Sequence, residues 1–215
     1  MKLTSILFSS ICLFSIACNN DKSNSNNSGD SATIDSVAAI TAASTTWIVD
    51  PKSSSVVWKG TKPTGEHIGT INIKEGSVSS EDGKIIAGNF IIDMSTIVET
   101  SNSDKPKSQD KLVTHLKSSD FFSVDSFPIS TFAITKVEGI TISGNLTIKN
   151  ITREVKFTTD VKIDGAILKA STIFDLDRTD FGINYNSGKK LKDKVADNLI
   201  GDNINFKISL VAYKQ

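Results

Sequence analysis

The sequence alternates most regularly in residues 140–164, which read Ile-Thr-Ile-Ser-Gly-Asn-Leu-Thr-Ile-Lys-Asn-Ile-Thr-Arg-Glu-Val-Lys-Phe-Thr-Thr-Asp-Val-Lys-Ile-Asp. In 140–148 the even positions carry Ile, Gly or Leu, and the odd positions carry Thr, Ser or Asn. Residues 155–163 continue the alternation through Val155, Phe157, Val161 and Ile163. A period of two residues predicts β-strands with one apolar and one polar face. We therefore interpret this stretch as two long strands joined by a tight turn.

Two such strands cannot cover their own apolar faces, so other strands must complete the sheet. Segments with the same character are found at 47–50, 54–59, 67–79, 86–94, 129–137, 166–176 and 204–212. In the fourth of these segments the residues of apolar parity are Ile86, Gly88, Phe90, Ile92 and Met94. About eight strands with one apolar face each predict an all-β protein, an antiparallel β-barrel that closes on itself.

One or two short helices are expected beside the strands. Asp110 can cap the first helix, because a carboxylate accepts hydrogen bonds from the free amides of a helix N-terminus. The second helix is predicted from Lys189, since Leu191, Val195 and Leu199 follow at helical spacing.

Charge and cysteine content exclude several classes of protein. The 24 basic residues balance the 24 acidic ones, whereas a nucleic-acid-binding protein usually has a basic surplus. The two cysteines are Cys12 and Cys18, so everything after Cys18 lacks both a disulfide framework and a cysteine metal site.

The N-terminus has the features of an export signal. Lys2 precedes the apolar run 3–16, which is too short to span a membrane as a stable helix. The segment 15–18, Ser-Ile-Ala-Cys, resembles the lipobox of bacterial lipoproteins, in which the cysteine is acylated and becomes the new N-terminus. We predict a lipoprotein signal peptide at 1–17 and acylation of Cys18, with secretion bearing an unpaired thiol as the alternative.

The residues after Cys18 are rich in Asn, Ser, Ala and Thr and contain few large apolar side chains. Such a composition cannot bury enough surface to offset the entropy of ordering the chain. We predict that 18–46 is a lipid-anchored flexible, disordered tether and that 47–215 is the folded barrel domain.

Several spaced motifs of the domain are similar to those of the YceI-like family. They are Trp47-x-x-Asp50-Pro51, Ser54-x-Val56-x-Trp58, His115-Leu-Lys-Ser-x-Asp120-Phe-Phe122, Phe127-Pro128 with Phe132, Gly144-Asn-Leu-Thr-Ile148, Arg178-x-Asp180-Phe-Gly182 and the terminal Leu210-Val-Ala212. The resemblance implies a lipocalin-like barrel with a long internal pore. It also implies an exported protein that holds a polyisoprenoid chain in that pore without catalysis. Residues 62–71 resemble a lipoprotein branch of the family.

The expected ligand-binding residues fall into two groups. The inward candidates on the strands are Trp58, Phe90, Ile92, Phe132, Ile142, Leu146, Phe157, Ala170, Phe174 and Phe206. The candidates at the mouth, which would neutralise an anionic or oxygen-rich head group, are Lys62, His67, His115 and Arg178. Packing in a filled core is the alternative for any one inward residue. Gly88 and Gly144 would leave room in the pore or permit bends.

Two other functional classes are weighed against lipid binding. His67 and His115 could form a metal or hydrolytic site with Asp120 or Glu66, although their spacing matches no ligand motif. No GxSxG motif supports a serine hydrolase. The second class is an envelope interaction module whose barrel is solidly packed and whose loops bind a protein.

Arg178 is open to two interpretations. With its neighbours Asp177 and Asp180 it could bind a phosphate head group, or it could form an ion pair that fixes the loop. The favoured prediction is a non-catalytic, lipid-anchored protein of the bacterial envelope that carries or sequesters an amphiphilic ligand. We expect this protein to need no cofactor and to be compatible with a homodimer. We expect it to face the periplasm or to sit on the outer membrane.

Overall fold

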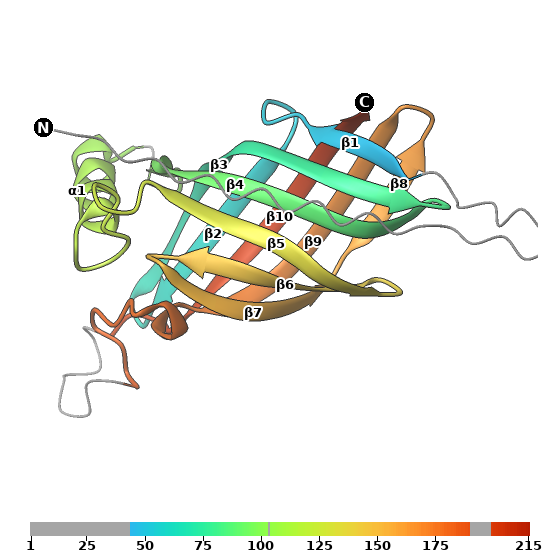
Figure 1. The fold of residues 1–215 in the computed structure, drawn as a ribbon. Helices are drawn as coiled ribbons and strands as arrows, with labels where there is room; N and C mark the ends of the chain where they lie inside the picture. The colour runs from blue at the N-terminus through green and yellow to red at the C-terminus, as the bar shows by residue number, and fades with distance from the viewer. Residues whose placement is uncertain (1–43, 103, 190–198) are drawn as a thin grey trace, which may run out of the picture. The chain divides into compact units, whose positions relative to one another are not determined.

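The computed structural model describes residues 44–102, 104–189 and 199–215, which form a curled antiparallel sheet with one α-helix (Figure 1). The predicted signal peptide, Cys18, nearly all of the predicted tether and most of the helix predicted from Lys189 lie outside these residues. The elements are β1 Thr45–Val49, β2 Ser55–Lys62, β3 Gly65–Glu81, β4 Lys84–Glu99, α1 Pro106–Lys117, β5 Ile129–Glu138, β6 Thr141–Ile148, β7 Ile151–Thr158, β8 Asp160–Asp164, β9 Ile167–Asp177, the 3-10 turn η1 Arg178–Phe181 and β10 Asn203–Lys214.

The 10 strands follow the order β7-β6-β5-β4-β3-β1-β10-β9-β8, and β2 also pairs with β3 and β10. β1 and β2 therefore share one position between β3 and β10. β8 continues β7 after a single residue, Thr159, so these two strands share another position. The strands thus occupy eight positions, which confirms the prediction of an antiparallel barrel of about eight strands.

The stretch 140–164 forms three strands where two were predicted. β6 and β7 make the expected hairpin, whose turn residues Lys149 and Asn150 have φ of 52° and 60°, as in a type I′ turn. At Thr159 the chain changes partner, because β7 pairs with β6 whereas β8 pairs with β9. The second predicted strand is therefore split at the place where the sheet meets its other end.

One end of the barrel is filled by a tightly packed core. Leu168 and Ala212 are fully buried there, and the Trp47 indole donates a hydrogen bond of 2.8 Å to Ser80 Oγ. β1 begins at Thr45, two residues inside the segment predicted as tether.

Two local predictions are corrected by the structure. Between β3 and β4 a bulge places Ile85 in the core and leaves Ile86 46% exposed, so the predicted inward parity at Ile86 is wrong. Helix α1 begins at Pro106 and not at Asp110, because proline suits the first helical position, where no amide partner is needed. Leu116 of α1 is buried.

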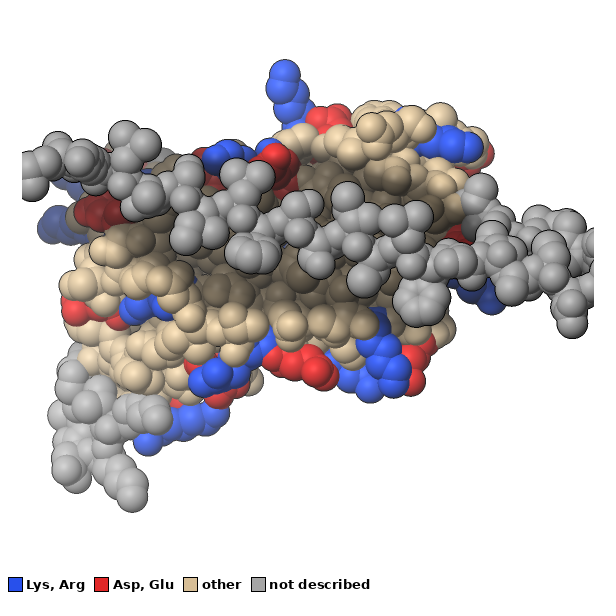
Figure 2. All heavy atoms as spheres, in the orientation of Figure 1, with Lys and Arg blue, Asp and Glu red and all other residues tan. Residues whose placement is uncertain are grey.

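The surface carries both signs of charge without segregation on the face shown in Figure 2, where basic and acidic residues alternate around the domain. Within the described ranges, no helix is both long enough and apolar enough to cross a bilayer.

Candidate ligand cavity

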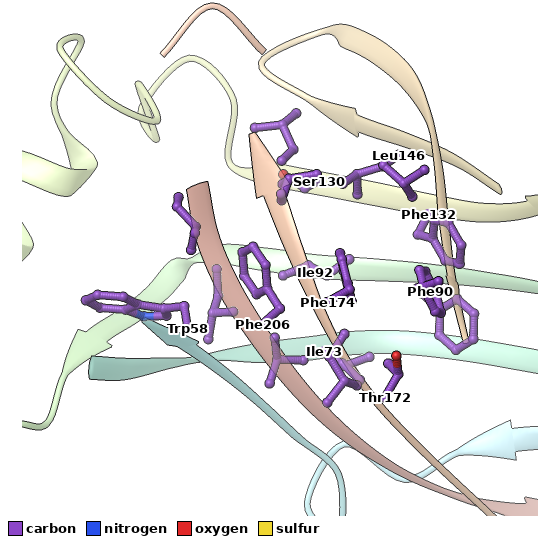
Figure 3. Close-up of a pocket in the computed structure, with 18 of the residues that line it drawn as sticks. Trp58, Ile73, Phe90, Ile92, Ser130, Phe132, Leu146, Thr172, Phe174 and Phe206 are labelled. Carbon is purple, nitrogen blue, oxygen red and sulfur yellow. The ribbon is translucent and has the colours of Figure 1, made fainter. Parts of the chain in front are cut away.

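The barrel encloses a cavity of about 360 Å³, within the usual range of small-molecule sites. Its lining is overwhelmingly apolar, and in Figure 3 the labelled side chains of Trp58, Phe90, Phe174 and Phe206 surround a common space. Val78, Ile85, Leu168 and Leu210 line it on the side of the packed core. Leu112, Leu116, Phe121 and Phe122 of α1 and the following segment also contribute to its lining. The interior is therefore hollow over part of its length.

Five phenylalanine rings form a girdle inside the barrel, each from a different strand. Along the girdle the ring centroids lie 6.1 Å apart for Phe90 and Phe132, 5.6 Å for Phe132 and Phe157, 4.7 Å for Phe157 and Phe174, and 5.7 Å for Phe174 and Phe206. Such spacings are those of interacting aromatic pairs. The alternation predicted that each ring points inward, but it contained no signal that the rings touch.

Glycines make room for the aromatic rings. A Cβ on Gly144 would lie 2.4 Å from Phe132 Cε2, and one on Gly69 would lie 2.3 Å from Trp58 Cζ2. A Cβ on Gly88 would lie 2.9 Å from Ile134 Cδ1. The space left by Gly88 and Gly144 is thus occupied by neighbouring side chains, and the expectation that it adds free room to the pore is wrong.

The side chains of Ser130 and Thr172 are polar groups in the lining that the alternation did not single out, although both share the parity of inward apolar residues. Each is hydrogen-bonded within the protein. Ser130 Oγ lies 3.1 Å from Met94 Sδ, and Thr172 Oγ1 donates to the carbonyl of Thr158 at 2.7 Å. Neither of these two side chains therefore offers a free polar group to the cavity.

The barrel closes through side chains at a seam between β7 and β9. Across these two described strands no ladder of backbone hydrogen bonds is formed. Thr172 Oγ1 bonds to the Thr158 carbonyl, and Thr159 Oγ1 donates to the Ser171 carbonyl at 3.0 Å. The Thr159 amide donates to the Ile140 carbonyl at 2.8 Å. Along this seam, hydrogen bonds of two threonine side chains stand where the other neighbouring strands form a backbone ladder.

A polar cluster lies where β2, β3 and β4 meet. His67 lines the cavity, and its Nδ1 lies 3.3 Å from Oε1 of Glu99, whose side chain is only 1% exposed. The same Oε1 accepts hydrogen bonds from Ser101 Oγ at 2.5 Å and from Asn102 Nδ2 at 2.6 Å. Asn102 Nδ2 also lies 3.3 Å from His67 Nδ1. The other carboxylate oxygen, Oε2, is buried and has no hydrogen-bond partner among the described residues.

The surroundings of Glu99 keep its carboxyl group ionised. Burial by itself would raise the pKa of Glu99, but hydrogen bonds from Ser101, Asn102 and His67 outweigh it and hold the pKa below the ordinary value of 4.5. A buried negative charge therefore lies directly behind His67. The sequence predicted His67 but not Glu99, which is 32 residues away and has no local motif.

Arg178 lines the cavity as predicted, but it is buried and its donors bind backbone carbonyls. Its Nε donates to the Gly201 carbonyl at 3.0 Å, Nη1 to Ile183 at 2.7 Å and Nη2 to Ile200 at 3.0 Å. The carboxylate within ion-pair distance is Asp202, at 3.5 Å. Burial lowers the pKa of Arg178, although a guanidinium stays protonated. Of the two interpretations, the geometry supports fixation of the loop, with Asp202 in place of Asp177 or Asp180.

His115 does not belong to the cavity lining. Its Nε2 lies 3.2 Å from Asp120 Oδ2, and its ring packs edge-on against Phe121 and Tyr185. The prediction that His115 joins the mouth is therefore wrong, because α1 turns its ring toward the segment that follows the helix. Lys62, by contrast, lines the cavity from an exposed position.

The inward candidates from the strands all line the cavity. They are Trp58, Phe90, Ile92, Phe132, Ile142, Leu146, Phe157, Ala170, Phe174 and Phe206. His67 and His115 lie in separate clusters, and among the residues that the structure describes no group of three His, Cys, Asp or Glu side chains could hold a metal ion. The geometry therefore offers no support for the metal site weighed from the sequence.

The sequence model of one protein family, the YceI-like domain, matches residues 47–212. Over 103 residues the chain is 35% identical to the UPF0312 protein SAS2572 of Staphylococcus aureus (strain MSSA476), an alignment that covers 42% of this chain and 56% of that protein. The chain thus matches little more than half the length of this curated relative.

Two solved structures share the fold. The crystal structure of Burkholderia cenocepacia BcnA superposes with a TM-score of 0.59 at 20% identity, covering 76% of this chain and 98% of BcnA. A polyisoprenoid binding domain from Saccharophagus degradans, implicated in plant cell wall breakdown, superposes with a TM-score of 0.56 at 12% identity. The superposition covers 79% of this chain and 98% of that domain. At these identities the likeness establishes the fold alone.

Proposed function

The chain belongs to the YceI-like family, and from this premise we propose that it is a binding protein for an amphiphilic, polyisoprenoid-like lipid. The lipid chain occupies the barrel cavity, and the protein sequesters or carries it without chemical change. The polyisoprenoid binding domain of Saccharophagus degradans, which shares the fold, supports this ligand class.

The observation that carries the proposal is the apolar cavity of about 360 Å³ with its phenylalanine girdle. Transfer of each methylene from water to such a lining stabilises the complex by about 0.8 kcal/mol, so a prenyl chain binds without strong polar contacts. The hydroxyl groups of Ser130, Thr159 and Thr172 in the lining are already hydrogen-bonded within the protein. The cavity is thus suited to hydrocarbon and poorly suited to a polar substrate.

Filling the cavity tests the proposal. Ala170 lines it, so Ala170→Phe should remove lipid that co-purifies with the protein, as measured by native mass spectrometry and solvent extraction. The melting temperature should change little, because free space receives the ring, whereas overpacking a filled core would cost about 1–3 kcal/mol. Lys169→Phe, on the exposed face of the same strand, is the control and should retain lipid. Wild-type protein without lipid, or an Ala170→Phe variant that retains it, would refute the proposal.

We further propose that the protein is anchored in the bacterial envelope through acylated Cys18, facing the periplasm or on the outer membrane. Support comes from the apolar run before Cys18 and the polar segment after it. Cys18→Ser should move the folded domain into the soluble periplasmic fraction. A variant that still fractionates with membranes would count against acylation.

A further inference from the structure

We propose that His67, backed by Glu99, receives the head group of the lipid, and that this head group is an uncharged hydrogen-bond donor such as a hydroxyl. The inference rests on the proposed function, and it assigns a role to a polar pair at one side of an otherwise apolar cavity. It narrows the anionic or oxygen-rich head group expected from the sequence to an uncharged, oxygen-containing one.

The position of His67 gives it access to the cavity. His67 lies directly opposite Gly60 across β2 and β3, and both residues line the cavity. Directly opposed residues of an antiparallel pair share one face of the sheet. A Cβ on Gly60 would have no atom within 4 Å, so there is open space beside the histidine ring.

The partners of His67 determine which chemistry it offers. Nδ1 faces both the ionised Glu99 carboxylate and the Asn102 amide nitrogen, each at 3.3 Å. The full negative charge of the carboxylate outweighs the amide dipole and favours the ring proton on Nδ1. Among the described residues no hydrogen bond engages Nε2, which then presents a lone pair as an acceptor. A ligand hydroxyl can donate to this nitrogen.

Glu99 strengthens the preference for a neutral head group. Its carboxylate is buried, and Oε2 lacks a partner within the described part of the chain. Glu99 is not part of the cavity lining, so it acts through His67, and its negative charge disfavours a phosphate at that ring. Two cations of the described residues line the cavity. Arg178 has donors engaged by three backbone carbonyls, and Lys62 lies in an exposed position, where water weakens its attraction for a phosphate.

Three probes that share the farnesyl chain and differ only in the head group test the proposal. They are farnesol, farnesyl methyl ether and farnesyl phosphate. The ether keeps the oxygen but lacks the donor. For the delipidated wild-type protein we expect Kd for farnesol to be about tenfold lower than for the ether, the effect of one hydrogen bond. Farnesyl phosphate should bind more weakly than farnesol.

Two variants locate the effect. His67→Leu removes the acceptor, and Gly60→Val fills the open space beside it, so in each the farnesol-to-ether ratio should fall to about one while the ether still binds. His115→Leu makes the same chemical change at a histidine outside the cavity lining and should keep the tenfold ratio. The melting temperature of each variant shows whether it folds. If His67→Leu does not fold, the ratio measured for Gly60→Val tests the proposal.

The outcomes separate the two proposals. Equal wild-type affinities for farnesol and its ether, tighter binding of the phosphate, or an unchanged ratio in both His67→Leu and Gly60→Val would overturn the head-group assignment and leave the lipid-binding function intact. Failure of all three probes to bind would overturn the proposed function itself.

Discussion

Arg178 shows how a charged side chain can be a structural residue beside a binding cavity. Its guanidinium donates to the carbonyls of Ile200 and Gly201 and to that of Ile183, just after η1, and it lies over the Phe121 ring at 5.7 Å. A planar group with several donors in fixed directions can satisfy buried carbonyls that a lysine could not. The residue therefore holds together the loops beside the cavity.

Replacement of Arg178 should destabilise the fold. Arg178→Ala would leave three carbonyls without their donors and Asp202 without its cation, so we expect a loss of about 3 kcal/mol in the free energy of unfolding, measured with urea. Arg153→Ala is the matched control, because Arg153 is exposed and its side chain donates to the carbonyl of the preceding residue. Its free energy of unfolding should change by no more than about 0.5 kcal/mol. Unchanged stability with selective loss of phosphorylated lipids would instead favour the head-group role.

Glu99 should make stability depend on acid pH. Its pKa is lower in the folded protein than its ordinary value of 4.5, so it contributes stability above that pH and loses this contribution as pH falls through the folded pKa. The melting temperature of wild type should exceed that of Glu99→Gln near neutral pH, and the difference should shrink below about pH 4.5. A constant difference across the acid range would show that Glu99 acts through packing alone.

At the scale of elements, the girdle depends on glycines in neighbouring strands. Gly144→Ala would bring a Cβ within 2.4 Å of Phe132 Cε2 and 2.6 Å of the Ala133 carbonyl oxygen. We expect a loss of about 1–3 kcal/mol in unfolding free energy from overpacking. Gly60→Ala, which meets nothing within 4 Å, should be neutral or slightly stabilising in the same denaturation measurement. Similar effects of the two substitutions would mean that Phe132 moves freely.

The seam between β7 and β9 should open more readily than the rest of the barrel. Threonine contacts join these strands, whereas β10 pairs with β9, β2 and β1 over its length. Local opening is easiest where few hydrogen bonds must break. In hydrogen exchange monitored by mass spectrometry, peptides covering 151–158 should exchange faster than those covering 203–214. Equal protection would indicate a barrel that opens only by global unfolding.

At the scale of the whole molecule, alternation was sufficient to predict the barrel and its inward face. Residues such as Phe90, Phe174 and Phe206 need only their parity to be assigned to the lumen. The split at Thr159 could not be foreseen, because a strand that changes partner keeps the same local pattern. The bulge that moves Ile85 inward likewise depends on the partner strand and not on the segment itself.

The polar contacts were harder to predict than the fold. The Glu99 carboxylate meets His67 across 32 positions of sequence, and Arg178 reaches carbonyls more than 20 residues away. Backbone carbonyls carry no sequence signature, so an arginine that binds them looks the same as one that awaits a phosphate. His115 and His67 were grouped because they are the same residue type, but the fold separates them.

The placement of the two tryptophans gives the protein its own optical reporter. Trp47 is sealed in the packed core by its hydrogen bond to Ser80, whereas Trp58 lines the cavity and donates to the Thr70 carbonyl at 3.3 Å. A ligand in the cavity changes the surroundings of Trp58 and leaves those of Trp47 constant. Titration with a prenyl alcohol that does not absorb tryptophan emission should change only the part of the emission that Trp58→Phe removes, with Trp47 as an internal standard. The chain can thus report its own occupancy without an attached dye.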